Sequence, residues 1–429
     1  MAEENAMSCR ILQTLENILK SDPELQEFGI IPTEDNTRNK SPVVYEEHNL
    51  GLESWCIKHV YQYACSTLFQ NRELLLRNKL GYNKMENMNH ILIGAILINP
   101  ECTTFWNMKR NLVENDILKI EDELHFSKIV LTFKSKSFES FSYRRWLLKR
   151  QLEKFSANNL EIPMSLLQNE FAVTNMASEK IACNYHSWNH RLWCMEHIAS
   201  NCQTISNIIY SELSYSQEWI NNHISEHTGY HYRQYLIKLV RGHKKVVAVY
   251  DSYYNFVVKS LLKMMNDGDY SNLLTYLMGK PSRTRILEEK CSYVNYISIL
   301  LYDLCVLVDK LNNLYPEHEA LFYHRRFLVY HLLKVPYEYH GLELEAKSKN
   351  QFNILMVENK NITDSSTVVN VSENVDNRWP KLFKMSPKSE LYNLYGIVSN
   401  CEKSFASKNC SVLQIAKYRK WLKHVVGFD

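Results

Sequence analysis

A ten-residue signature recurs along this 429-residue chain. Each copy has an aromatic residue, an Arg three residues later and a second aromatic two residues beyond the Arg. The four clear copies occupy residues 137–146, 184–193, 226–235 and 318–327. A unit that cannot bury its apolar face alone must stack on its neighbours. The signature therefore predicts an array of stacked repeats.

The first aromatic and the Arg of each copy are expected to lie between repeats. There the rings would fill space, and each Arg would stack on them or donate to loop carbonyl groups. Weaker copies begin at Trp106, which is followed by Lys109, and near Tyr418. The predicted repeat-core residues are Trp106, Phe141, Trp188, Arg191, Tyr230, Arg233, Phe322 and Arg325.

The spacing of the signature favours pairs of helices. Successive first aromatics at positions 106, 141, 188 and 230 are 35, 47 and 42 residues apart, which suits two-helix repeats with loops of variable length. Only 11 Gly and 10 Pro are present, which disfavours a turn-rich β protein. We therefore expect an all-α chain of antiparallel helix pairs.

One repeat is readable in detail. Pro163 suits the first residue of a helix that ends near Ser178, because its missing N–H is not needed there. Asn184 can cap the next helix, which carries the clearest copy of the signature. We expect a further long helix over 286–314, after a loop at 266–285.

The chain is expected to have four regions. A helix over about residues 8–19 is followed by a loop to 49, and the repeats then dominate. The segment after them lacks periodicity and is rich in Asn, Ser and Val, which predicts a flexible insert. The predicted boundaries are 1–50 for the N-terminal helix and extended segment, 51–344 for the repeats, 345–389 for the insert and 390–429 for C-terminal helices with a degenerate last repeat.

Composition excludes several classes of function. Fifty Lys and Arg against 47 Asp and Glu give a net charge of +3, which is too even to indicate nucleic-acid binding. The eleven Cys show no metal-ligand spacing, so no metal site is expected on this chain. The longest apolar run, 91–98, is too short for a transmembrane helix, and the N-terminus lacks a signal pattern. These features predict a soluble cytoplasmic protein.

Stacked repeats bring the starts of equivalent helices into one row. Helix N-termini and basic side chains attract anions there, and diphosphate is a natural candidate. One repeat would contribute Lys136, Arg144 and Arg145, and the next Tyr185, His186 and His190.

The pattern Asn-Tyr-His-x-Trp-x-His-Arg-x-Trp at 184–193 resembles the α subunits of protein farnesyl- and geranylgeranyltransferases. The resemblance extends over about 90–335 and 418–422. It implies a crescent-shaped, right-handed α-α superhelix (solenoid) wrapped around a β subunit. That subunit would hold the zinc and the isoprenoid pocket, and geranylgeranyl diphosphate would be the co-substrate.

The resemblance also implies roles for single residues. Catalytic roles fall on Lys136, which would contact the diphosphate, and on Tyr185 and His186. Two positions depart from the family pattern: Phe138 lacks the hydroxyl of the family Tyr, and Glu139 replaces a Gln that holds the substrate's C-terminal carboxylate. The predicted substrate-binding residues are Phe138, Glu139, Asn184 and Arg144.

Segments 49–56, 227–236 and 418–422 look closer to one branch of the family. That branch implies a Rab-type β subunit and a third class of protein geranylgeranyltransferase. Its substrate would be a protein such as a SNARE that already carries a farnesyl group. The protein substrate, the isoprenoid length, the β subunit and the need for an adaptor stay open.

Two other classes of function also stay open. One is a non-catalytic helical-repeat scaffold or adaptor of the tetratricopeptide kind, although the aromatic-x-x-Arg core differs from that pattern. The other is an RNA-processing repeat protein, which the near-neutral charge disfavours.

Overall fold

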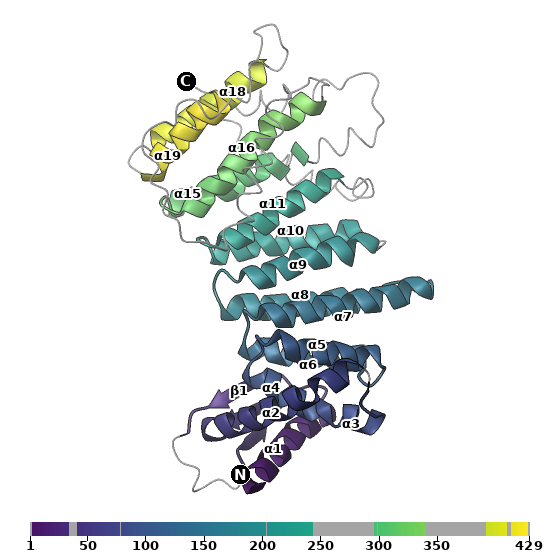
Figure 1. Cartoon of the computed structure of the whole chain (residues 1–429). Coiled ribbons are helices and arrows are strands. Elements are labelled where there is room, and N and C mark those ends of the chain that lie inside the picture. Colours follow the sequence, from purple (N-terminus) through teal and green to yellow (C-terminus); the bar gives the residue numbers. More distant parts are fainter. Residues whose placement is uncertain are drawn as a thin grey trace. The chain divides into compact units, whose positions relative to one another are not determined.

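The computed structural model describes eight stretches of the chain (Figure 1). They are residues 2–33, 41–77, 79–202, 204–242, 296–297, 299–339, 392–409 and 413–427. The chain forms two compact units, Met1–Gln203 and Thr204–Asp429. The expected loop at 266–285 and the expected insert at 345–389 lie outside the described residues.

Unit 1 begins with a helix and a small sheet. Helix α1 (Ala2–Ser21) is followed by the strands β1 (Glu27–Ile31), β2 (Val43–Glu46) and β3 (Asn49–Glu53). The strand order is β1-β3-β2, with β1 parallel and β2 antiparallel to β3. The sheet packs on the helices through Leu50 and Leu52, which are buried in the core of unit 1.

The predicted loop up to residue 49 is therefore wrong over β1 and β2, and β3 begins where the loop was expected to end. The strands have only four or five residues each, too few for a clear two-residue periodicity. Glu47 and His48 form the turn between β2 and β3 with φ angles of 44° and 65°. Gly and Asn usually occupy such positions, so the turn carried no familiar signal. The predicted boundary at residue 50 falls inside β3.

The rest of unit 1 is built from helices. Antiparallel pairs follow one another, α6 with α7 and α8 with α9, and the second helix of each carries the signature. The elements after the sheet are η1 (Ser54–Cys56), α2 (Ile57–Leu76), α3 (Tyr82–Glu86), α4 (Met88–Ile98), α5 (Thr103–Glu114), α6 (Ile120–Phe133), α7 (Phe138–Ala157), α8 (Met164–Lys180), α9 (Tyr185–His197) and η2 (Ala199–Asn201).

Unit 2 continues the same scheme in its described part. The signature lies in the second helix of a pair, in α11, α16 and α19. The elements are α10 (Ile205–Asn222), α11 (His227–Gly242), the π-helical segment η5 (Asp303–Val308), α15 (Asp309–Leu314), α16 (Glu319–Tyr339), α18 (Tyr392–Lys408), α19 (Leu413–Trp421) and the π-helical segment η7 (Leu422–Val426).

The expected all-α architecture of helix pairs is confirmed, with the small sheet as an addition. The helix expected over 8–19 exists but begins six residues earlier, at Ala2. Pro163 is the N-cap of α8, one residue before the expected position. Asn184 caps α9 as predicted, since its side chain accepts from the Ser187 N–H.

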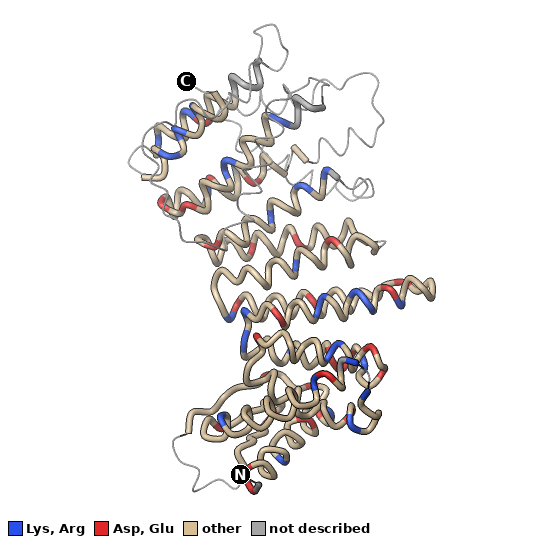
Figure 2. The backbone as a smooth tube through the Cα atoms, viewed as in Figure 1, with Lys and Arg blue, Asp and Glu red and all other residues tan. Residues whose placement is uncertain are grey.

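Charged residues of both signs are spread over the described helices, as Figure 2 shows, which agrees with the small net charge. Within the described part of the chain, every helix is too short or too polar to cross a bilayer.

Candidate functional site

The eight predicted repeat-core residues are all buried in the structure. Trp106 has no exposed surface, and Trp188 is the most exposed of the eight at 5%. The Arg side chains do more than stack on rings, because each donates hydrogen bonds to groups on a preceding or following helix. In α7, Arg144 shows the pattern most fully.

Arg144 forms a bidentate ion pair with Glu170 of α8. Its Nε and Nη2 atoms donate to the two carboxylate oxygens at 2.6 and 2.7 Å. The same carboxylate accepts from His190 Nε2 of α9 at 2.8 Å. Burial alone would raise the pKa of Glu170, but Arg144 and His190 outweigh burial and lower it to about 2. Glu170 is therefore ionised and joins three consecutive helices.

The same arrangement recurs in both units, and we call it the carboxylate ladder. A carboxylate on the first helix of a pair binds the basic residue of the preceding signature. It also accepts from a Tyr or His on the helix that follows. Further steps are Lys109–Glu123–Tyr143, Arg233–Asp303–His324 and Arg325–Glu402–Tyr418.

A sequence signal for the ladder exists and was missed. In three first helices, an acidic residue is followed by Leu or Phe and, four residues after the acid, by Ser or Thr. Each of these carboxylates lies 20 residues before the Tyr or His that donates to it. The three motifs are Glu123–Ser127, Glu170–Thr174 and Glu212–Ser216. The hydroxyl accepts from the Arg of its own pair, for example Ser127 from Arg144 Nη1 at 3.1 Å.

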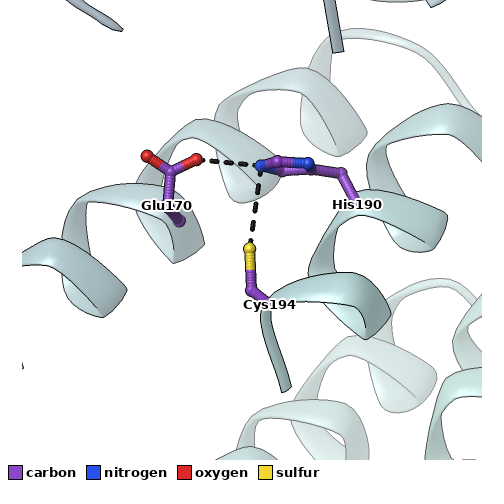
Figure 3. A group of neighbouring side chains, drawn as sticks. All are labelled: Glu170, His190 and Cys194. Carbon is purple, nitrogen blue, oxygen red and sulfur yellow. Dashed lines mark hydrogen bonds and ion pairs between the residues drawn. The ribbon is translucent and has the colours of Figure 1, made fainter. Parts of the chain in front are cut away.

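Glu170, His190 and Cys194 lie close enough together to suggest a metal site, as Figure 3 shows. The ladder already occupies this group, because both oxygens of Glu170 bind Arg144. A cation here would lie beside a guanidinium group. Burial also raises the pKa of the Cys194 thiol well above its usual value, whereas metals bind the thiolate. The group is therefore part of the buried ladder.

The predicted catalytic residues lie together at one edge of unit 1. Lys136 is in the turn between α6 and α7, and Tyr185 and His186 begin α9. The α6–α7 and α8–α9 connections lie on the same side of the unit (Figure 1). The ring of Phe138, the first residue of α7, packs edge-on against His186 at 5.7 Å between centroids. We call Lys136, Phe138, Tyr185 and His186 the N-terminal edge.

The N-terminal edge is accessible to a ligand or a partner. Tyr185 and Phe138 are 60% and 49% exposed, which is unusual for aromatic side chains in this chain. Lys136 is exposed, and among the described residues its ammonium group makes no hydrogen bond or ion pair. The edge thus presents an uncompensated cation and two rings at the starts of two helices, where the helix dipoles favour an anion.

His186 is held in its neutral form. Burial lowers the pKa of its ring, Glu101 opposes this, and the positive charges of Arg145 and Lys136 lower the pKa further. A neutral imidazole can donate one hydrogen bond without adding a second full charge beside Lys136. The charges of Arg145 and Lys136 therefore act on the His186 ring.

Glu139 lies next to the edge and is anchored by α5. Its Oε1 accepts a hydrogen bond from the Thr103 hydroxyl at 2.8 Å. The carboxylate is on the first turn of α7, where it interacts favourably with the helix dipole.

Two of the predicted substrate-binding residues lie behind the edge. Arg144 is buried and bound to Glu170, as described above. Asn184 has no exposed surface, and its amide donates to the carbonyl oxygens of Ser135 and Ala177 at 2.7 and 2.9 Å. Both side chains are engaged by protein groups and support the residues in front of them.

Comparison with known proteins agrees with this repeat structure. The family model described as "Protein prenyltransferase alpha subunit repeat" matches residues 120–151 and 167–198, which are the α6–α7 and α8–α9 pairs. Within these two matches lie two of the ladder carboxylates, Glu123 and Glu170.

Several curated proteins are similar along much of the chain. Protein prenyltransferase alpha subunit repeat-containing protein 1 of Danio rerio is 26% identical over 449 aligned residues, covering 97% of each chain. The Homo sapiens protein of that name is 29% identical over 332 residues, 75% of this chain and 77% of its own. Geranylgeranyl transferase type-2 subunit alpha of Saccharomyces cerevisiae is 28% identical over 146 residues, 32% of this chain and 41% of its own.

Proposed function

Because two helix pairs of this chain match the protein prenyltransferase α subunit repeat and much of the chain is similar to proteins that contain it, we propose that it is the α subunit of a heterodimeric protein geranylgeranyltransferase. The enzyme would transfer geranylgeranyl from its diphosphate to a Cys of a protein substrate. A β subunit of the Rab type would hold the zinc and the isoprenoid, and this chain would be active only with that partner. The similarity to a type-2 geranylgeranyl transferase α subunit supports the choice of partner.

The observation that carries this proposal is the exposed cation at the N-terminal edge. In the transfer, the substrate sulfur forms a bond to the isoprenoid carbon while the bond from that carbon to the diphosphate breaks. Negative charge builds on the departing diphosphate. Lys136 would stabilise this charge more in the transition state than in the ground state, which is the condition for catalysis.

The other edge residues fit the same role. Neutral His186 and the Tyr185 hydroxyl can each donate a hydrogen bond to a diphosphate oxygen. Phe138, which is 49% exposed, offers apolar surface to an isoprenoid or to the partner subunit. Together they would give a site for a ligand with an anionic head and an apolar tail.

Glu139 bears on the choice of protein substrate. A carboxylate at this position repels a free C-terminal carboxylate, and the hydrogen bond from Thr103 holds it beside the edge. Recognition of an ordinary C-terminal tetrapeptide is therefore disfavoured. A folded substrate fits better, and a farnesylated SNARE is the candidate we propose.

The decisive experiment is co-expression of this chain with a Rab-type β subunit, followed by transfer of labelled geranylgeranyl to a farnesylated SNARE. We expect a stable complex that transfers the label, while neither subunit does so alone. Failure to form a complex would refute the proposal. A stable complex without transfer to any prenylation substrate would favour the scaffold alternative.

Lys136→Ala tests the role of the edge within that complex. We expect kcat to fall about a hundredfold, the typical cost of losing one donor to a developing anion, while complex formation is unchanged. Lys134→Ala is the matched control, because Lys134 is an exposed Lys of the same turn whose ammonium group lies over the Phe133 ring. Equal loss of complex formation and turnover in Lys136→Ala would assign Lys136 to structure.

A further inference from the structure

Asn184 is the one side chain that bonds to both segments of the N-terminal edge among the hydrogen bonds described for unit 1. Its Nδ2 donates to the Ser135 carbonyl at 2.7 Å and to the Ala177 carbonyl at 2.9 Å. Its Oδ1 accepts from the Ser187 N–H at 3.3 Å. The side chain has no exposed surface, so these bonds do not compete with water.

Each of these bonds fixes a different part of the site. Ser135 is the residue before Lys136, so the bond to its carbonyl holds the turn that carries the ammonium group. The bond from Ser187 closes the first turn of α9, which carries His186. The bond to Ala177 ties both to α8. One amide therefore connects the turn that carries Lys136 with α8 and with the start of α9, which carries His186.

Other hydrogen bonds fix the turn at residues 134–137 to the start of α7. Ser137 caps α7 by accepting from the Ser140 N–H at 3.2 Å, and the Ser137 N–H donates to the Lys134 carbonyl at 2.9 Å. These bonds keep the turn on its own helix but do not reach α9. Removing the Asn184 bond would thus take away the hydrogen bond between the turn and α9 and leave α7 capped.

We propose that Asn184 is a positioning residue that holds Lys136 and His186 at a fixed separation, so that both can face one anionic group. This inference rests on the function proposed above and names the device that assembles its site. Other polar residues of similar size do not supply these bonds. Asp has the acceptor but places a carboxylate against two carbonyl oxygens, and Ser caps a helix but does not reach Ser135.

The ring of His186 reports on this separation without any enzymatic assay. The groups that face it are Glu101 from before α5, Arg145 of α7 and Lys136 of the turn, with the rings of Phe138 and Tyr185 against it. Because Lys136 lowers the pKa of His186, Lys136→Met is expected to raise it. The size of that rise measures how close the ammonium group lies to the ring.

The test is a double-mutant cycle on the full-length chain, read by NMR titration of the His186 ring, with the signal assigned from His186→Gln. Asn184→Ser keeps a neutral cap on α9 but removes the bond to Ser135. We expect Lys136→Met to raise the His186 pKa in the wild-type background and to have little effect in Asn184→Ser. An equal rise in both backgrounds would overturn the proposal.

Ser187→Ala is the matched control. Its hydroxyl lies in the same buried turn of α9 and donates to the Thr174 carbonyl at 2.8 Å, but it does not contact the Lys136 turn. We expect this variant to lose stability and to keep the full effect of Lys136→Met. Loss of that effect in Ser187→Ala would show that any weakening of α9 suffices, which would also overturn the proposal.

A second background keeps the inference testable if Asn184→Ser does not fold. Asn184→Asp adds a charge near His186, but this charge is present with and without Lys136. The change in the His186 pKa caused by Lys136→Met therefore still reports on the separation of Lys136 and His186. It is expected to shrink in this background, and an unchanged difference counts against the proposal.

Transfer by the complex with the β subunit separates this inference from the proposed function. We expect Asn184→Ser to lower kcat about tenfold to a hundredfold, the range for a misplaced catalytic group, with a smaller change in KM for the diphosphate. If the wild-type complex transfers no isoprenoid while the NMR cycle behaves as expected, the proposed function fails and the positioning role stands. If the cycle fails, the positioning role falls whatever the complex does.

Discussion

At the scale of single residues, the buried charges of the carboxylate ladder are found in matched sets. Arg144 and His190 both donate to the carboxylate of Glu170, and each of the three residues is at most 3% exposed. Breaking a buried pair by removing one partner leaves an uncompensated charge, which usually costs about 3–5 kcal/mol. The signature Arg is therefore a structural requirement, and the exposed Lys136 is a different kind of basic residue.

We expect Arg144→Met to lower the free energy of unfolding by about 3–5 kcal/mol, because Glu170 would stay buried without its cation. Chemical denaturation followed by circular dichroism measures this. The double variant Arg144→Met/Glu170→Gln removes both charges and should recover much of the loss. A double variant as unstable as the single one would show that the side chains matter by shape and not by charge.

The candidate site shows how far the sequence alone could go. The signature located Lys136, Tyr185 and His186, and the structure brings the three to one edge. Arg144 and Asn184 were predicted to bind substrate at the same edge, but both are buried. The pattern gives the position of a residue along the chain and does not show whether its side chain is buried. Whether a side chain is buried or exposed depends on its partners. Glu170 is 26 residues away from Arg144 in the sequence, and Ser135 is 49 residues away from Asn184.

At the scale of elements, the small sheet is attached to the helices at its outer strand. Strand β1, at one end of the strand order, packs against α6, and the Phe28 N–H donates to the Thr132 hydroxyl at 3.1 Å. Lys180 of α8 reaches the Thr132 carbonyl at 2.9 Å and Glu27 at 3.1 Å. An unpaired strand edge invites aggregation, and these contacts cover part of this one.

Thr132→Val keeps the shape of the side chain but removes the acceptor for the Phe28 N–H. We expect a loss of about 1–3 kcal/mol, the usual cost of a buried donor left without a partner. Amide hydrogen exchange should show faster exchange at Phe28. Thr67→Val is the control, because the Thr67 hydroxyl donates only to a carbonyl of its own helix. Unchanged exchange at Phe28 in Thr132→Val would mean that the strand is held by other contacts.

The helices were predictable and the strands were not, for a physical reason. Helical periodicity extends over 20 residues in α7, which is long enough to be read with confidence from apolar spacing. Each strand has at most five residues, and the pairing of β1 with β3 joins residues 22 apart, such as Gly29 and Gly51. The pairing is decided by the helices beneath the sheet, which local sequence does not report.

At the scale of the whole molecule, the ion pairs of the carboxylate ladder join residues that are close in the sequence and residues that are far apart. Lys109 and Glu123 are 14 residues apart, whereas Arg325 and Glu402 are 77 apart. In unit 2 the guanidinium of Arg325 also stacks on the Phe405 ring at 3.4 Å. The last helices are therefore held to α16 by buried contacts as well as by the connecting chain.

We expect the chain to tolerate a break between residues 345 and 389. Two co-expressed fragments that end and begin in this stretch should copurify, because the contacts of Arg325 with Glu402 and Tyr418 with Glu402 do not need the connection. Glu402→Gln in the shorter fragment should weaken the association at least tenfold, the equivalent of about 1.4 kcal/mol. Fragments that do not associate would show that the covalent link is required.

Every complete step of the ladder presents the same chemistry at its junctions: a cation on one side and a carboxylate on the other. If the α6–α7 pair were lost as a block, Lys109 of α5 would face Glu170 in place of Glu123, and no charge would be stranded. Duplication of a pair has the same property. Such a chain can gain or lose whole helix pairs during evolution. Each new junction would again pair one buried cation with one buried carboxylate, so no intermediate would contain an unpaired buried charge.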